Sequence, residues 1–119
     1  MASSKVRHDS LRNWIAELPD VTEAPHRFGA VEFQVHGLEF MHIHGQTHLD
    51  IRLSKEDQVR VLREGKAGEH LYEPQGGWVT LRIRSEKDHE TAKEVVLLAY
   101  NNARQIMAQR KSLNQASAR

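Results

Sequence analysis

The chain has no cysteine among its 119 residues. This absence excludes a disulfide framework, a zinc site built from thiolates and a cysteine nucleophile. Long apolar runs are also missing, because no stretch approaches the ~20 residues that a transmembrane helix needs. The N-terminal sequence MASSKVRHDS lacks the apolar centre of a signal peptide. We therefore expect a soluble, cytoplasmic protein with no membrane partner.

The sequence also lacks an excess of charge and the common catalytic signatures. Its formal net charge is +1, so overall electrostatics give no reason to expect a nucleic-acid partner. Only residues 104–119 are markedly basic, which is typical of a solvated helix end and tail. There is no G-x-G-x-x-G fingerprint, P-loop, G-x-S-x-G elbow or H-E-x-x-H helix. The enzyme classes that those motifs identify therefore have no support.

The most informative stretch that is present is EFMHIHGQTHLDIRL, residues Glu39–Leu53. Its alternation of apolar and polar side chains predicts two strands, Leu38–His44 and Thr47–Leu53, with the turn at Gly45-Gln46. Residues 30–35 alternate in the same way. We therefore expect a three-stranded antiparallel meander.

The remaining elements follow from periodicity and capping residues. A 3.6-residue period predicts helices, and serine caps mark where two of them begin. The expected elements are a helix near Ser10–Leu18, a loop over Val21–Gly29, a helix from Ser54 to about Arg63, short strands over Glu69–Glu73 and Trp78–Arg84, and a helix from Ser85 to about Gln109.

The order α-β-β-β-α-β-β-α predicts a single α+β domain. We expect an antiparallel sheet of about five strands, with the helices packed on one face. The expected division is an N-terminal helix and loop over residues 1–24, the α+β domain over residues 25–109, and a basic, disordered tail over residues 110–119.

Alternation along the strands separates their side chains into two faces of the sheet. The face toward the helices would carry Val31, Phe33, Val35, Glu39, Met41, Ile43, Leu49, Ile51, Leu53, Val79, Leu81 and Ile83. The opposite face would carry Leu38, Phe40, His42, His44, His48, Asp50, Arg52, Trp78, Thr80, Arg82 and Arg84. Imidazoles, guanidiniums and an indole are unusual on a solvated face. We therefore expect a pocket, or a homodimer contact that covers Leu38 and Phe40.

Three functions compete for the histidine cluster. In the first, a divalent metal such as zinc or non-haem iron binds to four side chains, His42, His44, His48 and Asp50. In the second, the histidines act as general acids and bases, while Arg82 or Arg84 holds an anionic substrate. In the third, they form a structural network or line a ligand site without chemistry. We assign no role to the histidines expected in loops and on helix surfaces, His8, His26 and His89.

Several segments occur in an order that is typical of one family. They are HRFGAVEF (His26–Phe33), HIHGQTHLDI (His42–Ile51), HLYEP (His70–Pro74), GWVTLRIRSEKD (Gly77–Asp88) and LLAY (Leu97–Tyr100). This combination resembles the luciferase-domain family, which is named for the fungal luciferase, over about Pro25–Ala103. One departure is Gly29-Ala30, where the family often has Gly-Gly before the first strand.

The resemblance implies a functional pocket and a class of reaction. The fungal enzyme is an oxygenase that acts on a polyphenolic pyrone, whereas many members are small bacterial proteins of unassigned function. The leading hypothesis is therefore a small-molecule oxygenase or related oxidoreductase. Its catalytic residues would be His42, His44, His48, Asp50 and His70, and its substrate-binding residues would be Trp78, Arg82, Arg84 and Arg52.

Two other classes of function stay open. The alternative to an enzyme is a non-catalytic module that binds an anionic small molecule or a partner protein. A third class, a DNA-binding module, rests on the basic tail and on a similarity in strand and helix order to the MmcQ/YjbR group. The divalent metal of the first function above is the one cofactor that the residues suggest.

Overall fold

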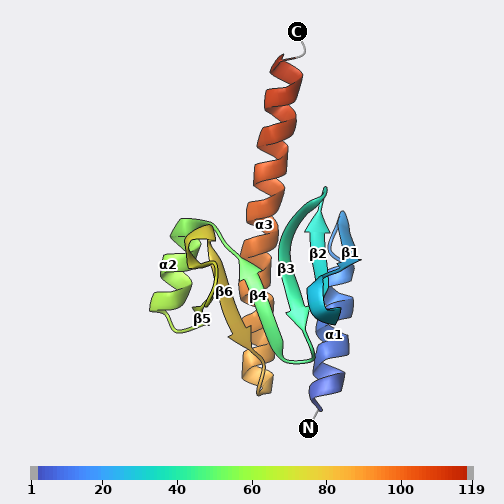
Figure 1. Ribbon diagram of the computed structural model, residues 1–119, viewed down its shortest axis with the longest axis vertical. Coiled ribbons are helices and arrows are strands. Elements are labelled where there is room, and N and C mark those ends of the chain that lie inside the picture. Colours follow the sequence, from blue (N-terminus) through green and yellow to red (C-terminus); the bar gives the residue numbers. More distant parts are fainter. Residues whose placement is uncertain (1–2, 118–119) are drawn as a thin grey trace.

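The computed structural model describes residues 3–117. Its centre is a six-stranded antiparallel sheet with the strand order β1-β2-β3-β4-β6-β5, and three α-helices accompany it (Figure 1). The strands are β1 (Val21–Pro25), β2 (Val31–Val35), β3 (Leu38–His44), β4 (His48–Arg52), β5 (Gly68–Glu69) and β6 (Trp78–Arg82). The helices are α1 (Ser4–Ala16), α2 (Lys55–Arg63) and α3 (Glu86–Ser117), with short 3-10 turns η1 (Arg27–Gly29) and η2 (Pro74–Gly76).

Helices α1 and α3 cover one face of the sheet. Helix α3 packs against β2, β3 and β4, and α1 packs against α3 and β1 (Figure 1). The aliphatic side chains that alternation assigned to this face are buried or, for Val31, half-buried in the core. The predicted α+β domain is confirmed, with six strands rather than about five.

Two strands at the sheet edges differ from the prediction. Val21–Pro25 was expected to be a loop but forms β1, which pairs with β2 along its whole length. Proline is tolerated there because β1 is an edge strand and Pro25 is its last residue. At the other edge, β5 ends at Glu69 instead of continuing to Glu73. The backbone N–H groups of Tyr72 and Glu73 donate hydrogen bonds to Nδ1 of His70. These two bonds form a turn that directs the chain out of the sheet.

A β-bulge in β3 overturns part of the predicted division into faces. The register passes from Phe33 opposite Met41 to Gln34 opposite Glu39, so Phe40 is the extra residue. Its ring is 1% exposed and lies edge-on to Tyr100 of α3, with 5.8 Å between centroids. Phe40 therefore belongs to the core, and the carboxylate of Glu39 reaches His42 on the opposite face. Leu38 also packs against the core, so neither apolar side chain requires a homodimer to cover it.

Helices α1 and α3 differ from the prediction at their ends, since α1 begins earlier than Ser10 and ends at Ala16, before Leu18, and α3 ends later than expected. Ser3 caps α1, which begins before the expected Ser10. Helix α3 continues to Ser117, past the expected end near Gln109, and projects beyond the sheet (Figure 1). The last two residues of the predicted tail lie outside the described residues. Within residues 3–117, no helix combines the length and apolarity that crossing a membrane requires.

One glycine fixes how β6 enters the sheet. Gly77 has φ 88°, and a Cβ there would lie 2.1 Å from the carbonyl oxygen of Leu53. Its own carbonyl accepts a hydrogen bond of 2.9 Å from the N–H of Leu53. This close approach aligns β6 beside β4, so Trp78 enters the sheet directly opposite Arg52.

The placement of Phe40 generates a stability prediction. Phe40→Ala should lower the free energy of unfolding by about 3–5 kcal/mol, because it opens a cavity beneath α3. Phe28→Ala is the matched control, since Phe28 is 97% exposed and its removal should change stability by less than about 0.5 kcal/mol. Urea denaturation of both variants measures the difference. Equal small effects would contradict the core position of Phe40.

Candidate functional site

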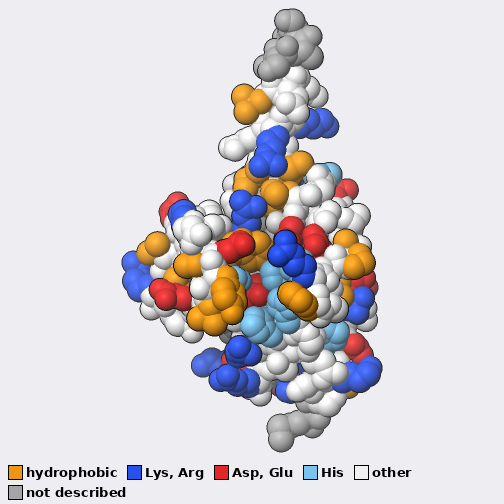
Figure 2. Space-filling model, in the orientation of Figure 1, with side chains coloured by type: hydrophobic (Ala, Val, Ile, Leu, Met, Phe, Trp, Pro, Cys, Tyr) orange, Lys and Arg blue, Asp and Glu red, His pale blue; other side chains and the backbone are white. Residues whose placement is uncertain are grey.

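The sheet face opposite α1 and α3 holds a pocket of about 1070 Å³. Histidines gather in its hollow, with exposed hydrophobic side chains on both sides (Figure 2). The predicted site residues that line it are His42, His44, His48, Asp50, His70, Trp78, Arg82 and Arg84. Arg52 does not line the pocket, although the sequence placed it with this group.

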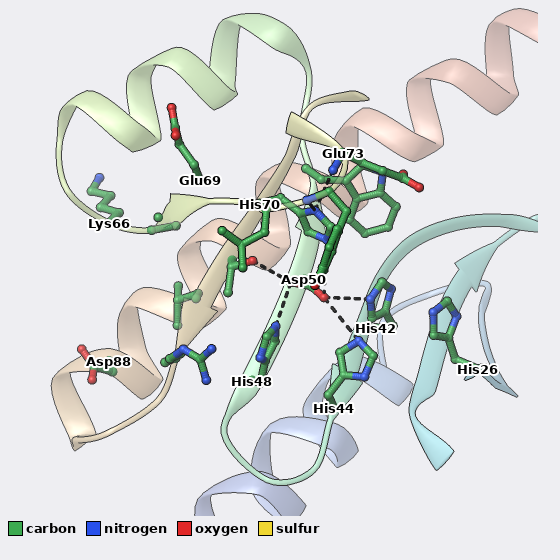
Figure 3. A pocket seen from close by; sticks show the side chains of 18 of the residues that line it. His26, His42, His44, His48, Asp50, Lys66, Glu69, His70, Glu73 and Asp88 are labelled. Atoms are coloured by element: carbon green, nitrogen blue, oxygen red, sulfur yellow. Dashed lines mark hydrogen bonds and ion pairs between the residues drawn. The ribbon is translucent and has the colours of Figure 1, made fainter. Parts of the chain in front are cut away.

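Asp50 on β4 is the centre of the site (Figure 3). Its Oδ2 accepts a hydrogen bond from Nε2 of His42 at 2.9 Å. Its Oδ1 accepts bonds from Nε2 of His48 at 3.0 Å and from Oγ1 of Thr80 at 2.7 Å. Nε2 of His44 lies 3.3 Å from Oδ2, and Nε2 of His70 lies 3.6 Å from it. Four imidazoles and a hydroxyl therefore surround one carboxylate.

This carboxylate is charged although it is only 4% exposed. Burial by itself would raise the pKa of Asp50, but the hydrogen bonds from His42, Thr80 and His48 outweigh burial. They hold the pKa of Asp50 well below its usual range. The buried negative charge therefore requires a positive partner.

His42 supplies that positive charge. Its Nε2 faces Asp50, while its Nδ1 lies 3.0 Å from Oε2 of Glu39. The carboxylates of Asp50 and Glu39 can both accept a hydrogen bond from the His42 ring only if both of its ring nitrogens carry protons. Burial would lower the pKa of His42, but the hydrogen bonds to Asp50 and Glu39 raise it to about 9. At neutral pH His42 is therefore a fixed imidazolium.

His44 differs from its neighbour in charge. Burial and the nearby positive charge of His42 lower the pKa of His44. Its side chain is 35% exposed, and within the described residues its Nδ1 makes no hydrogen bond. A neutral imidazole with a free ring nitrogen at the pocket surface has the properties of a general base.

His70 is held in one tautomer by the backbone. The N–H groups of Tyr72 and Glu73 donate to its Nδ1 at 3.1 and 3.0 Å. Nδ1 is therefore an acceptor, and the ring proton lies on Nε2, which points toward Asp50. His70 thus presents a neutral N–H donor to the floor of the pocket.

Three residues that the sequence did not assign to the site also join its network, and they are His26, Glu32 and Glu39. The ring of His26 stacks on His42, with 4.0 Å between centroids and 13° between planes. Nδ1 of His26 lies 3.1 Å from Oε1 of Glu32 and 3.5 Å from Oε2 of Glu39. Glu32 alternates with the core residues of β2 but was not among the residues predicted for this face, and the bulge concealed Glu39. His89, expected on a helix surface, is 5% exposed.

The aromatic and cationic walls of the pocket come from β6 and the residues after it. Trp78 is 9% exposed, and its ring lies 5.3 Å from that of His42 and 6.1 Å from that of His70. Arg82 and Arg84 also line the pocket. Neither guanidinium forms an ion pair with a carboxylate within residues 3–117. Both are therefore available to an anionic ligand.

The side chains that could share a metal ion in the structure differ from the set suggested by the sequence, which was His42, His44, His48 and Asp50. In the described chain, the groups whose donor atoms lie within 4.8 Å of one another are His26, His42 and His44, and His26, Glu32 and Glu39. Neither group contains His48 or Asp50. The oxygens of Asp50 instead accept hydrogen bonds from His42, His48 and Thr80.

The charge on His42 generates a prediction for Glu39→Gln. A neutral amide would stabilise the protonated His42 ring less than the carboxylate does, so the pKa of His42 should fall from about 9 by about one unit or more. One pKa unit corresponds to about 1.4 kcal/mol of interaction with the charged ring. NMR titration of the His42 ring measures the change. Glu69→Gln, a carboxamide at an exposed position of the same pocket, is the matched control.

The same charge makes stability depend on pH. The pKa of His42 is raised from 6.5 to about 9, so its contribution of about 3 kcal/mol is complete below pH 6.5 and disappears as pH rises through 9. Urea denaturation between pH 6 and 9.5 should show this loss, and Glu39→Gln should show less of it. Identical pH dependence in wild type and variant would contradict the assignment.

Comparison with known proteins identifies a family. The family model described as Luciferase domain matches residues 37–99, which is more than half of the chain. The match contains the histidines around Asp50 together with Trp78, Arg82 and Arg84, whereas His26 and Glu32 precede it. A comparison with curated proteins gives no match. On the strength of the family match, the chain belongs to the luciferase-domain family.

Proposed function

We propose that the protein is a small-molecule enzyme in which histidine acid–base chemistry acts on an acidic organic substrate, with oxygenation as the overall reaction. One observation carries this proposal. A buried carboxylate, Asp50, holds histidines of different protonation state around the floor of a pocket of about 1070 Å³. Perturbed groups that converge in a cleft are typical of catalytic sites.

Three of the histidines have separate tasks in this proposal. His44 removes the proton from the substrate, because it is neutral and open to the pocket. His42 keeps its positive charge throughout and balances the anion that forms. His70 donates its Nε2–H toward a developing oxyanion, since backbone N–H groups occupy its other nitrogen.

The pocket also favours a substrate that is anionic or becomes so. Arg82 and Arg84 line it and form no ion pair within the described residues. A guanidinium can hold a carboxylate or enolate through two parallel hydrogen bonds. The charge of these residues would therefore favour the deprotonated substrate over the neutral one.

Oxygenation is the part of the proposal that family membership supports. An enol or phenol that has lost its proton carries electron density that molecular oxygen can accept. In that reaction, oxygen is the oxidant, and the proton taken by His44 passes to the reduced oxygen or to solvent. The residues of the pocket account for the deprotonation and for the stabilisation of the anion.

A second candidate function is binding of an anionic small molecule without chemistry. The two unpaired arginines favour it as well, because they require only a negatively charged ligand. The functions differ in their dependence on His44. Binding should tolerate His44→Gln, whereas proton abstraction should not.

The experiment offers purified protein a panel of acidic enols and phenols under air. Oxygen uptake is measured for the whole panel, and exchange for deuterium is measured at the C–H beside the carbonyl in the keto tautomers of the enols. His44→Gln and Asp50→Asn should each lower the rate about 100-fold or more, the usual contribution of a general base and its supporting group. His36→Asn is the matched control, since this exposed turn residue lies outside the pocket. Absence of uptake and exchange in the wild type, or equal rates in all variants, would contradict the proposal.

A further inference from the structure

We propose that His26, Glu32 and Glu39 form a binding site for a divalent first-row transition-metal ion at the edge of the pocket, which His26 and Glu39 line. This site is distinct from the set of His42, His44, His48 and Asp50 that the sequence suggested. It shares Glu39 with the acid–base proposal, but its test is separate, because metal binding requires no turnover.

The three side chains converge from separate elements. His26 lies between β1 and η1, Glu32 lies on β2, and Glu39 lies on β3. Their donor atoms all lie within 4.8 Å of one another. Each side chain is partly buried, with 20%, 17% and 26% of its surface exposed for His26, Glu32 and Glu39. The group is therefore held at the edge of the pocket yet accessible to an ion.

The distances fit shared coordination of one ion. Nδ1 of His26 lies 3.1 Å from Oε1 of Glu32 and 3.5 Å from Oε2 of Glu39. Two donors that each bind one ion at about 2.1 Å lie about 3.0–3.4 Å apart at octahedral or tetrahedral angles. The spacing of 3.1 Å falls within that range, and the spacing of 3.5 Å lies just above it.

Hydrogen bonding occupies only part of this group, because Gln34 donates to Oε2 of Glu32 and His42 donates to Oε2 of Glu39, which leaves Oε1 of each carboxylate without a bond from these partners. A single Nδ1–H of His26 can form one good bond, but two carboxylate oxygens face it. Glu32 and Glu39 are also close enough to repel each other, so a cation between them would stabilise both. A divalent ion would accept lone pairs from all three residues at once.

The other nearby group fits an ion poorly. Its members are His26, His42 and His44. The rings of His26 and His42 are nearly parallel, with 13° between planes and 4.0 Å between centroids. The lone pair of an imidazole lies in its ring plane, so two stacked rings cannot both direct a nitrogen at one ion. The two glutamates are free of that constraint, which favours the group of one histidine and two carboxylates.

The donor set also indicates the kind of metal. One imidazole nitrogen with two carboxylate oxygens suits ions such as Zn²⁺ and Mn²⁺, whereas Ca²⁺ and Mg²⁺ prefer oxygen ligands alone. Oε2 of Glu39 is shared with Nδ1 of His42. A bound ion would therefore lie beside the acid–base residues and could contact an anionic group of a ligand.

The test titrates untagged, metal-free protein with Zn²⁺ by calorimetry. Wild type should bind one ion, and Glu32→Gln should bind at least about tenfold more weakly. Glu69→Gln should bind as the wild type does, since Glu69 lines the pocket outside the proposed site. Asp50→Asn should also retain the ion. No binding by wild type at millimolar Zn²⁺, or loss in Asp50→Asn with retention in Glu32→Gln, would overturn the proposal.

A second measurement locates the ion in the wild type and needs no variant. Mn²⁺ should broaden the ring resonances of His26 more strongly than those of His48 and His70. Stronger broadening at His48 would place the ion beside Asp50 and contradict the proposed position. Because neither measurement uses a substrate, failure here leaves the acid–base proposal intact, and failure of turnover leaves this one intact.

Discussion

The buried charge of Asp50 is the constraint on which the polar face depends. A carboxylate that is 4% exposed loses most of its hydration, and that loss costs several kcal/mol unless charged and hydrogen-bonding partners replace the water. Its partners His42 and Thr80 stand directly opposite it on β3 and β6. A slip of one residue in either pairing would turn a partner toward the core. The register of three strands and the charge of the site are therefore fixed together.

The bulge at Phe40 extends this arrangement toward β2. By adding one residue to β3, it keeps both Phe40 and Met41 in the core. It also turns Glu39 to the polar face, where its carboxylate contacts His42 and His26. Without the bulge, strict alternation would direct Glu39 into the apolar layer beneath α3. A local irregularity thus provides the second negative charge that keeps His42 protonated.

Alternation of apolar and polar residues was enough to predict most of the sheet and the pocket-lining side chains of β4 and β6. It placed Leu49 and Ile51 in the core and His48 and Asp50 opposite them, because β4 is regular. It failed at β1, whose side chains carry no clear alternation. It failed at Glu39 too, because a bulge depends on packing against α3 and leaves no mark in the spacing. His26 was missed since its position depends on a loop.

Residue type alone could not assign roles to the histidines either. His42 is an imidazolium because two carboxylates flank it, and His70 is a neutral donor because two backbone N–H groups face its other nitrogen. The contact of His42 with Glu39 depends on the bulge, and the contacts of His70 with the backbone depend on the turn before η2. The spacing of histidines in the sequence reveals neither the bulge nor the turn. The proposed proton abstraction uses a neutral base beside a fixed positive charge that stabilises the anion. The rings of His44 and His42 lie with their centroids 4.7 Å apart. His42 is charged because it contacts the carboxylates of Asp50 and Glu39, whereas His44 is neutral and open to the pocket.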